Sequence, residues 1–187
     1  MDDKKNQIIE NAVEVFSRYG VRRTTMGDIA EHCGVSRQTL YASYANKEEV
    51  LKAAIRHLAE MTGQQIEQAW AQTDSVSERL DAYLQLAVVH YYEKMCQMPD
   101  AADLMQGFRE MGADELKCAE DQKMARLEVL FEPYADQLKS RGTTPKDMAE
   151  LFQTSSSNFK YVATDMDQLQ RLLGALKQST LVMLGEA

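Results

Sequence analysis

The stretch from Thr24 to Leu51 reads TTMGDIAEHCGVSRQTLYASYANKEEVL, and the rest of the chain is best interpreted from it. It predicts two short helices joined at Cys33-Gly34-Val35, because the glycine permits a positive φ and the valine can fill the angle between the helices. Thr25 and Ser36 are residue types that cap helix N-termini, and each stands directly before one of the two helices. We therefore expect a helix-turn-helix here.

The second of these helices is unusually polar for a structural element. Only Leu40 is apolar enough to face a core, and the side chains left for the surface are Arg37, Gln38, Thr39, Tyr41 and Ser43. The major groove of B-DNA admits one α-helix and presents hydrogen-bonding groups to side chains of these types. The pattern predicts a recognition helix for double-stranded DNA.

The residues on either side extend this motif. Ile9, Ala12, Val13 and Phe16 are spaced like one face of an amphipathic helix, and Gly20 is suited to ending it. After the motif, Lys47-Glu48-Glu49 places two acids in the first turn of a long helix, as the helix dipole prefers. The sequence thus predicts three helices before residue 50.

The net charge of −8 does not exclude a DNA-binding protein once it is divided along the chain. Residues 16–47 carry five Lys or Arg residues against two Asp or Glu residues. A local basic face can bind phosphates while the remainder stays acidic. We expect a DNA-binding domain over residues 1–50 and a helical regulatory and dimerisation domain over residues 51–187.

The N-terminal segment resembles the DNA-binding domain of the TetR family of transcriptional regulators. The residues that carry the resemblance are Thr24-Thr25, Ile29-Ala30, Gly34-Val35-Ser36, Thr39-Leu40-Tyr41, Tyr44, Lys47-Glu48 and Leu51. The remainder of the chain is similar to the family in its length and helicity. The resemblance implies a repressor that binds operator DNA as a homodimer and is released by a small-molecule effector bound to the C-terminal domain.

The resemblance also implies roles for single residues. Those expected in or beside the major groove are Arg37, Gln38, Tyr41 and Ser43. Those expected at or near DNA phosphates are Thr25, Thr39, Tyr44 and Lys47. Ala42 and Met26 depart from the aromatic and basic residues that many members carry at these positions. Arg37 and Gln38 should therefore carry more of the base preference.

The rest of the chain predicts further helices. Three prolines and nine glycines leave few breaks, and the expected ones lie at Asp74–Ser77, Pro99-Asp100 and Arg141–Pro145, with a kink at Pro133. We expect an all-α protein of eight or nine helices, comprising the three-helix DNA-binding domain and a C-terminal helical ligand-binding and dimerisation domain.

Residues between Tyr83 and Phe131 are rich in methionine and aromatic side chains, which line apolar ligand pockets but are equally typical of ordinary cores. The residues considered for an effector site are Tyr83, His90, Tyr91, Met95, Met105, Phe108 and Phe131. His90 is the candidate for a polar contact there, although an exposed or structurally bonded histidine fits the sequence as well.

The last helix carries more leucine than a single intramolecular contact needs. The residues predicted for a dimer interface are Leu169, Leu172, Leu173 and Leu176. Gly174 beside them would let a second helix approach closely. We expect a four-helix bundle between two copies of the chain.

Other functional classes find less support. Three scattered cysteines, expected to be buried thiols, form no CxxC pair, and neither a metal site nor a cofactor is expected. No GxSxG, HExxH or phosphate-loop motif suggests an enzyme. No long apolar run or secretory signal is apparent, so we expect a cytoplasmic protein without a membrane partner. A DNA-binding regulator without a small-molecule inducer remains an alternative, as does a helical carrier or enzyme.

Overall fold

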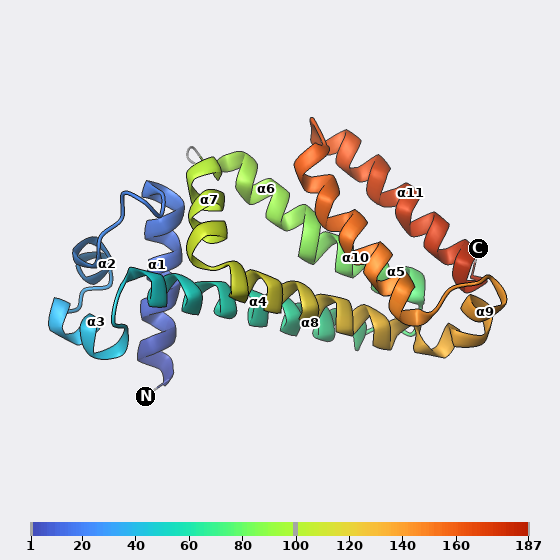
Figure 1. The fold of residues 1–187 in the computed structure, drawn as a ribbon, viewed down its shortest axis with the longest axis horizontal. Helices are drawn as coiled ribbons and strands as arrows, with labels where there is room; N and C mark the ends of the chain where they lie inside the picture. The colour runs from blue at the N-terminus through green and yellow to red at the C-terminus, as the bar shows by residue number, and fades with distance from the viewer. Residues whose placement is uncertain (1, 99–100, 187) are drawn as a thin grey trace. The chain divides into compact units, whose positions relative to one another are not determined.

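A computed structural model describes residues 2–98 and 101–186, and this part of the chain is built from helices without a strand (Figure 1). The N-terminal elements are α1 (Asp2–Tyr19), α2 (Met26–His32), α3 (Arg37–Ser43) and α4 (Lys47–Trp70). The middle elements are α5 (Val76–Leu84), the π-helical η1 (Gln85–Val89), α6 (His90–Gln97), α7 (Ala101–Met111) and α8 (Ala113–Phe131). The last are the 3-10 turn η2 (Glu132–Tyr134), α9 (Ala135–Ser140), α10 (Pro145–Val162) and α11 (Met166–Leu184).

The expected all-α fold is confirmed, although the described part of the chain holds eleven α-helices and not eight or nine. Two expected helices are interrupted. The π-helical turn η1 separates α5 from α6, and the 3-10 turn with Pro133 separates α8 from α9. The proline lacks an N–H, so the regular α-helical bonding cannot continue through it. The expected break at Pro99-Asp100 lies outside the described residues.

The helix starts follow the local signals in the sequence. Thr25, Ser36, Ser75 and Thr144 each accept a hydrogen bond from the backbone N–H three residues later, as N-caps do. Pro145 follows directly as the first residue of α10. Local chemistry therefore determines where these helices begin.

The helices group into two compact units. Unit 1 comprises Met1–Met61 and Lys94–Ala119, and unit 2 comprises Thr62–Glu93 and Glu120–Ala187. The expected boundary at residue 50 divides the chain by function, into a DNA-binding domain and a regulatory domain, and it stays a prediction. Packing places the boundary elsewhere, because α4 continues beyond residue 50 and α7 packs on α1.

Unit 1 has its own apolar core beneath the helix-turn-helix. The buried side chains come from each of the first four helices and from α7, and include Phe16, Ile29, Leu40, Leu51 and Leu104. Their burial explains why two helices as short as α2 and α3 hold a defined arrangement, since helices of this length are unstable alone.

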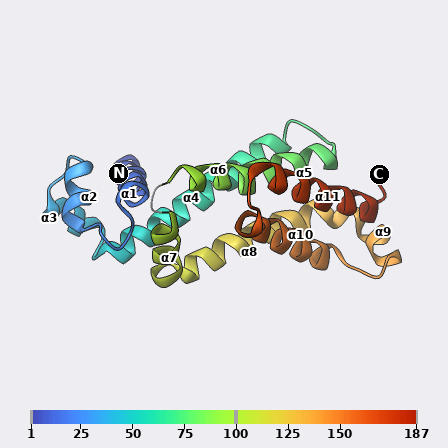
Figure 2. The same ribbon diagram turned by 90° about the horizontal axis from the view of Figure 1, so that it is seen from above.

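Unit 2 is built around aromatic side chains. The ring of Phe152 meets those of Tyr83 and Phe131 edge-on, with centroids 5.9 Å and 6.2 Å apart. Both views show α10 and α11 side by side, and α11 also contacts α5 (Figure 2). No helix in the described part of the chain is long and apolar enough to cross a membrane.

Burial changes the interpretation of the leucines of α11. Leu169 and Leu173 lie in the core of unit 2, with 0% and 4% of their surface exposed, so their side chains have little surface left for a second copy. Leu172 and Leu176 are partly exposed. The sequence alone cannot separate a face that packs on its own unit from one that packs on a partner. The cysteines also differ from expectation, since Cys96 and Cys118 are exposed.

Candidate nucleic-acid interface

The start of α2 is held by reciprocal hydrogen bonds between Thr25 and Asp28. The Asp28 N–H donates to Thr25 Oγ1 at 3.2 Å, and the Thr25 N–H donates to Asp28 Oδ2 at 2.8 Å. The bond from the Thr25 backbone, followed by that from its hydroxyl, lowers the pKa of Asp28. This capping box sets the angle at which the chain enters the motif.

The turn from α2 to α3 has the geometry that its sequence predicts. Gly34 has a φ of +64°, which side chains with a Cβ rarely adopt. The Val35 N–H then donates to the Ala30 carbonyl at 3.0 Å. Ser36 caps α3 through the Thr39 N–H at 3.0 Å. The turn is therefore defined by local bonds on both sides.

The surface of α3 is the one expected of a recognition helix. Leu40 is its one buried residue. Gln38 and Ala42 are exposed, and Tyr41 keeps 53% of its surface exposed. Arg37 is also exposed but lies against α2, since a Cβ added to Gly27 would be 2.6 Å from its Nη2. The helix thus presents donors, acceptors and one aromatic ring to the outside.

Other residues predicted to meet DNA already have local roles. The Thr25 hydroxyl donates to Asp28 Oδ2 at 2.8 Å, and Thr39 Oγ1 lies 2.9 Å from Ser36 Oγ. Ser43 and Tyr44 are half-buried, and Tyr44 packs against the core of unit 1. Burial raises the pKa of Tyr44. Their expected contacts with DNA stay predictions.

Lys47, expected at or near a DNA phosphate, already has partners within the chain. Its ammonium donates to the carbonyl oxygens of Val21 at 2.7 Å, Arg22 at 3.2 Å and Thr24 at 2.8 Å. An ammonium has three donors and the three carbonyls take all of them here, while its expected phosphate contact stays a prediction. Lys47 therefore fastens the start of α4 to the loop before α2, and phosphates would compete with three internal bonds.

The same loop is held from its other side by α7. Arg22 Nη2 lies 2.7 Å from Glu110 Oε1, and the Arg22 N–H lies 3.5 Å from Asp103 Oδ2. Gly107 packs so closely that an added Cβ would be 2.5 Å from the Val21 Cβ. No local pattern pointed to Asp103 and Glu110, because they follow the loop by about eighty positions and belong to no motif.

The residues considered for an effector site do not form one cluster. Met95, Met105 and Phe108 belong to unit 1, where Phe108 packs against the core. Tyr83 and Phe131 are fully buried in the core of unit 2. His90 is exposed and Tyr91 is half-buried, and their expected contacts with an effector stay predictions. The wider π-helical turn just before His90 alters the helical phase of the residues that follow it.

A surface groove of about 510 Å³ lies elsewhere on unit 2, between α5, η1 and α11. Its lining includes Leu84, Val89 and Gly174, with an ion pair between Asp81 and Lys177 at its edge. None of the residues considered for an effector site lines it.

Comparison with known proteins identifies the N-terminal segment. Residues 8–54 match the profile of a family described as bacterial regulatory proteins, tetR family. The chain is 43% identical over 58 residues to the HTH-type transcriptional regulator TtgR of Pseudomonas putida, a match covering 31% of this chain and 28% of TtgR. It is 36% identical over 53 residues to IcaR of Staphylococcus epidermidis, a negative transcriptional regulator of a biofilm operon, covering 28% of this chain and 29% of IcaR.

The fold is shared over nearly the whole chain. The structure of the fatty acid degradation regulator FadR from Bacillus halodurans is similar with a TM-score of 0.68 at 20% identity, covering 95% of this chain and 94% of FadR. The sequence matches to the curated relatives, in contrast, span about a third of their length or less. The matching segment is the one that holds the capped helices, the glycine turn and the exposed face of α3. The segment from residue 8 to residue 54 therefore belongs to the tetR family of bacterial regulatory proteins.

Proposed function

We propose that this protein is a transcriptional repressor that binds operator DNA as a homodimer, with α3 as its recognition helix. The observation that carries this proposal is the surface of α3, where Arg37, Gln38 and Tyr41 are exposed above the single buried Leu40. Repression is supported by the relative IcaR, which is a negative regulator. Arg is suited to guanine and Gln to adenine in the major groove.

Dimerisation is supported by apolar side chains left exposed on the last two helices. Leu151 of α10 and Val182 of α11 expose 55% and 53% of their surface. Leu172 and Leu176 of α11 are partly exposed. A second copy would cover such side chains, and two-fold symmetry would present two α3 helices to the DNA.

The proposal includes release by a small effector with an apolar or aromatic part that binds in the C-terminal helical region. Such a ligand must bind the DNA-free form more tightly than the DNA-bound form, since equal affinity shifts no population. The usual coupling is about 1–3 kcal/mol, and operator DNA must weaken ligand binding by the same factor. Control by a protein partner or by abundance is the alternative.

Selection of bound duplexes from a random pool, followed by anisotropy titration, tests operator binding. Gln38→Ala and Tyr41→Ala should each cost roughly 1–3 kcal/mol of affinity for the selected duplex and relax its base preference. Lys146→Ala, a charge change at an exposed position of α10, is the control and should leave both unchanged. Full affinity and preference in both α3 variants would exclude α3 as the recognition helix.

A further inference from the structure

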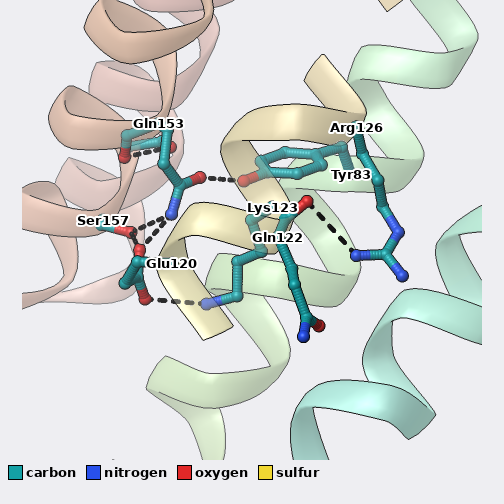
Figure 3. Close-up of polar contacts among 8 residues, drawn as sticks. Tyr83, Glu120, Gln122, Lys123, Arg126, Gln153 and Ser157 are labelled. Carbon is teal, nitrogen blue, oxygen red and sulfur yellow. Dashed lines mark hydrogen bonds and ion pairs between the residues drawn. The ribbon is translucent and has the colours of Figure 1, made fainter. Parts of the chain in front are cut away.

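A chain of polar side chains crosses unit 2 from its aromatic core to α8 (Figure 3). The Tyr83 hydroxyl donates to Gln153 Oε1, and Gln153 Nε2 donates to Glu120 Oε2 and, at 3.0 Å, to Ser157 Oγ. Ser157 Oγ donates to Glu120 Oε2 at 3.2 Å, and Lys123 Nζ lies 2.9 Å from Glu120 Oε1. Both carboxylate oxygens of Glu120 are therefore occupied.

Glu120 stays ionised at neutral pH. Burial alone would raise its pKa, but the charge and hydrogen bond of Lys123, with smaller contributions from Lys160 and Gln153, outweigh burial and lower it. Its single negative charge is balanced by Lys123. A second cation nearby is thus left without a counter-ion of its own.

That second cation is Lys160, one helical turn after Ser157 on α10. Its Nζ lies 4.5 Å from the centre of the Tyr91 ring and 5.3 Å from that of Tyr161. The residue is half-buried, and no carboxylate of the described residues lies within 4.0 Å of its ammonium. Two aromatic rings are weaker partners for a desolvated cation than a carboxylate.

The surroundings of Lys160 disfavour its charge. Burial, followed by the positive charge of Lys123, lowers the pKa of Lys160 to about 8, and the more distant Glu120 does not compensate. A partly desolvated cation without a counter-ion costs stability, and such groups concentrate at functional sites. Aromatic surface beside it is open to solvent, since Tyr161 exposes 51% of its surface.

We propose that Lys160 anchors the carboxylate of a small organic acid whose apolar or aromatic part lies against Tyr91 and Tyr161. The ammonium supplies charge-assisted hydrogen bonds to the acid. The acid in turn supplies a counter-ion for Lys160, because the carboxylate of Glu120 is paired with Lys123. The role of such an acid as the effector rests on the proposed function. Its binding does not.

Calorimetric titration of the full chain without DNA tests the site. The probes are 4-phenylbutanoate and octanoate, each compared with its neutral amide. Each acid should bind wild type at least about tenfold more tightly than its amide. Equal affinity of acid and amide would overturn the proposal, as would absence of acid binding up to about 10 mM.

Variants show which lysine is responsible. Lys160→Met should abolish the preference for the acid, and Lys160→Arg should keep it because the charge remains. Lys146→Met, an exposed lysine of the same helix, is the matched control and should behave as wild type. A preference that survives in Lys160→Met assigns the anion to another cation and overturns the proposal.

Operator binding without any acid separates this inference from the proposed function. If the protein does not bind operator DNA but its preference for the acid depends on Lys160, the acid site is supported and the proposed function is wrong. If wild type binds operator but shows no acid preference, the function stands and the site falls.

Discussion

At the scale of single residues, Lys47 has bonding partners within the chain that its place in the sequence did not predict. Its ammonium holds three carbonyls of the loop before α2, two of them from the buried residues Val21 and Thr24. Removing a charged donor from buried acceptors typically costs about 1.5–3 kcal/mol. Lys47→Met should therefore lower the free energy of unfolding by about that amount.

The same variant distinguishes this role from a phosphate contact. We expect Lys47→Met to weaken operator binding while the slope of affinity against salt concentration stays unchanged. A direct phosphate contact predicts a slope smaller by about one and little loss of stability. Urea unfolding and anisotropy at several salt concentrations measure both quantities, with Lys5→Met of α1 as an exposed control.

Lys160 is the second residue whose surroundings make a prediction. In the unfolded chain its pKa has the ordinary value of 10.5, whereas in the folded protein it is about 8. Between these pH values the unfolded state binds more protons, so this lysine's contribution to stability improves as pH rises from about 8 to 10.5. Below pH 8 the cost of the buried charge is fully present.

Lys160→Met should consequently be more stable than wild type at pH 7, by on the order of 1 kcal/mol, because methionine carries no charge to bury. The advantage should shrink at pH 9.5. Urea unfolding at both pH values measures it, with Lys146→Met as the control. An advantage that does not change with pH would show that the charge of Lys160 is not destabilising.

At the scale of elements, the turn between α2 and α3 depends on backbone conformation alone. Gly34 has a positive φ and no atom within 4 Å of an added Cβ, so Gly34→Ala strains the backbone without a steric clash. We expect a loss of about 1 kcal/mol. Gly174 of α11 also has free space but no positive φ, and Gly174→Ala should stabilise by roughly 0.5–1 kcal/mol.

The two glycine-to-alanine substitutions should change the stability of the protein in opposite directions, and this difference is the result to look for. Thermal unfolding of the two variants at one protein concentration checks them, since concentration affects the stability of an oligomer. A stable Gly34→Ala variant would mean that the turn does not need its left-handed residue.

At the scale of the whole molecule, the proposed dimer sets the form of the operator. Two symmetric α3 helices read successive major grooves only when half-sites lie about 34–36 Å apart, so the selected duplex should be an approximate palindrome. Leu151→Glu would place a charge in the proposed interface, and light scattering should show a shift from dimer to monomer. Val129→Glu changes an exposed apolar residue of α8 and should leave the dimer intact. A dimer that persists in Leu151→Glu would locate the interface elsewhere.

Local chemistry is what the sequence by itself determined. The caps at Thr25, Ser36 and Thr144 and the positive φ of Gly34 were predictable, because each depends on residues within a few positions. The exposed face of α3 followed from the same short stretch, since a helix with one apolar residue can bury little else.

Tertiary structure alone decided which partner each side chain took. Nothing in the sequence near Lys47 indicated a partner for it within the chain, yet the fold brings three carbonyls to it from more than twenty positions away. Leu169 and Leu173 looked available to a second copy, but α10 and α5 pack on α11 and bury them. Periodicity shows that a helix has an apolar face, whereas packing between distant segments determines what that face and its neighbouring charges meet.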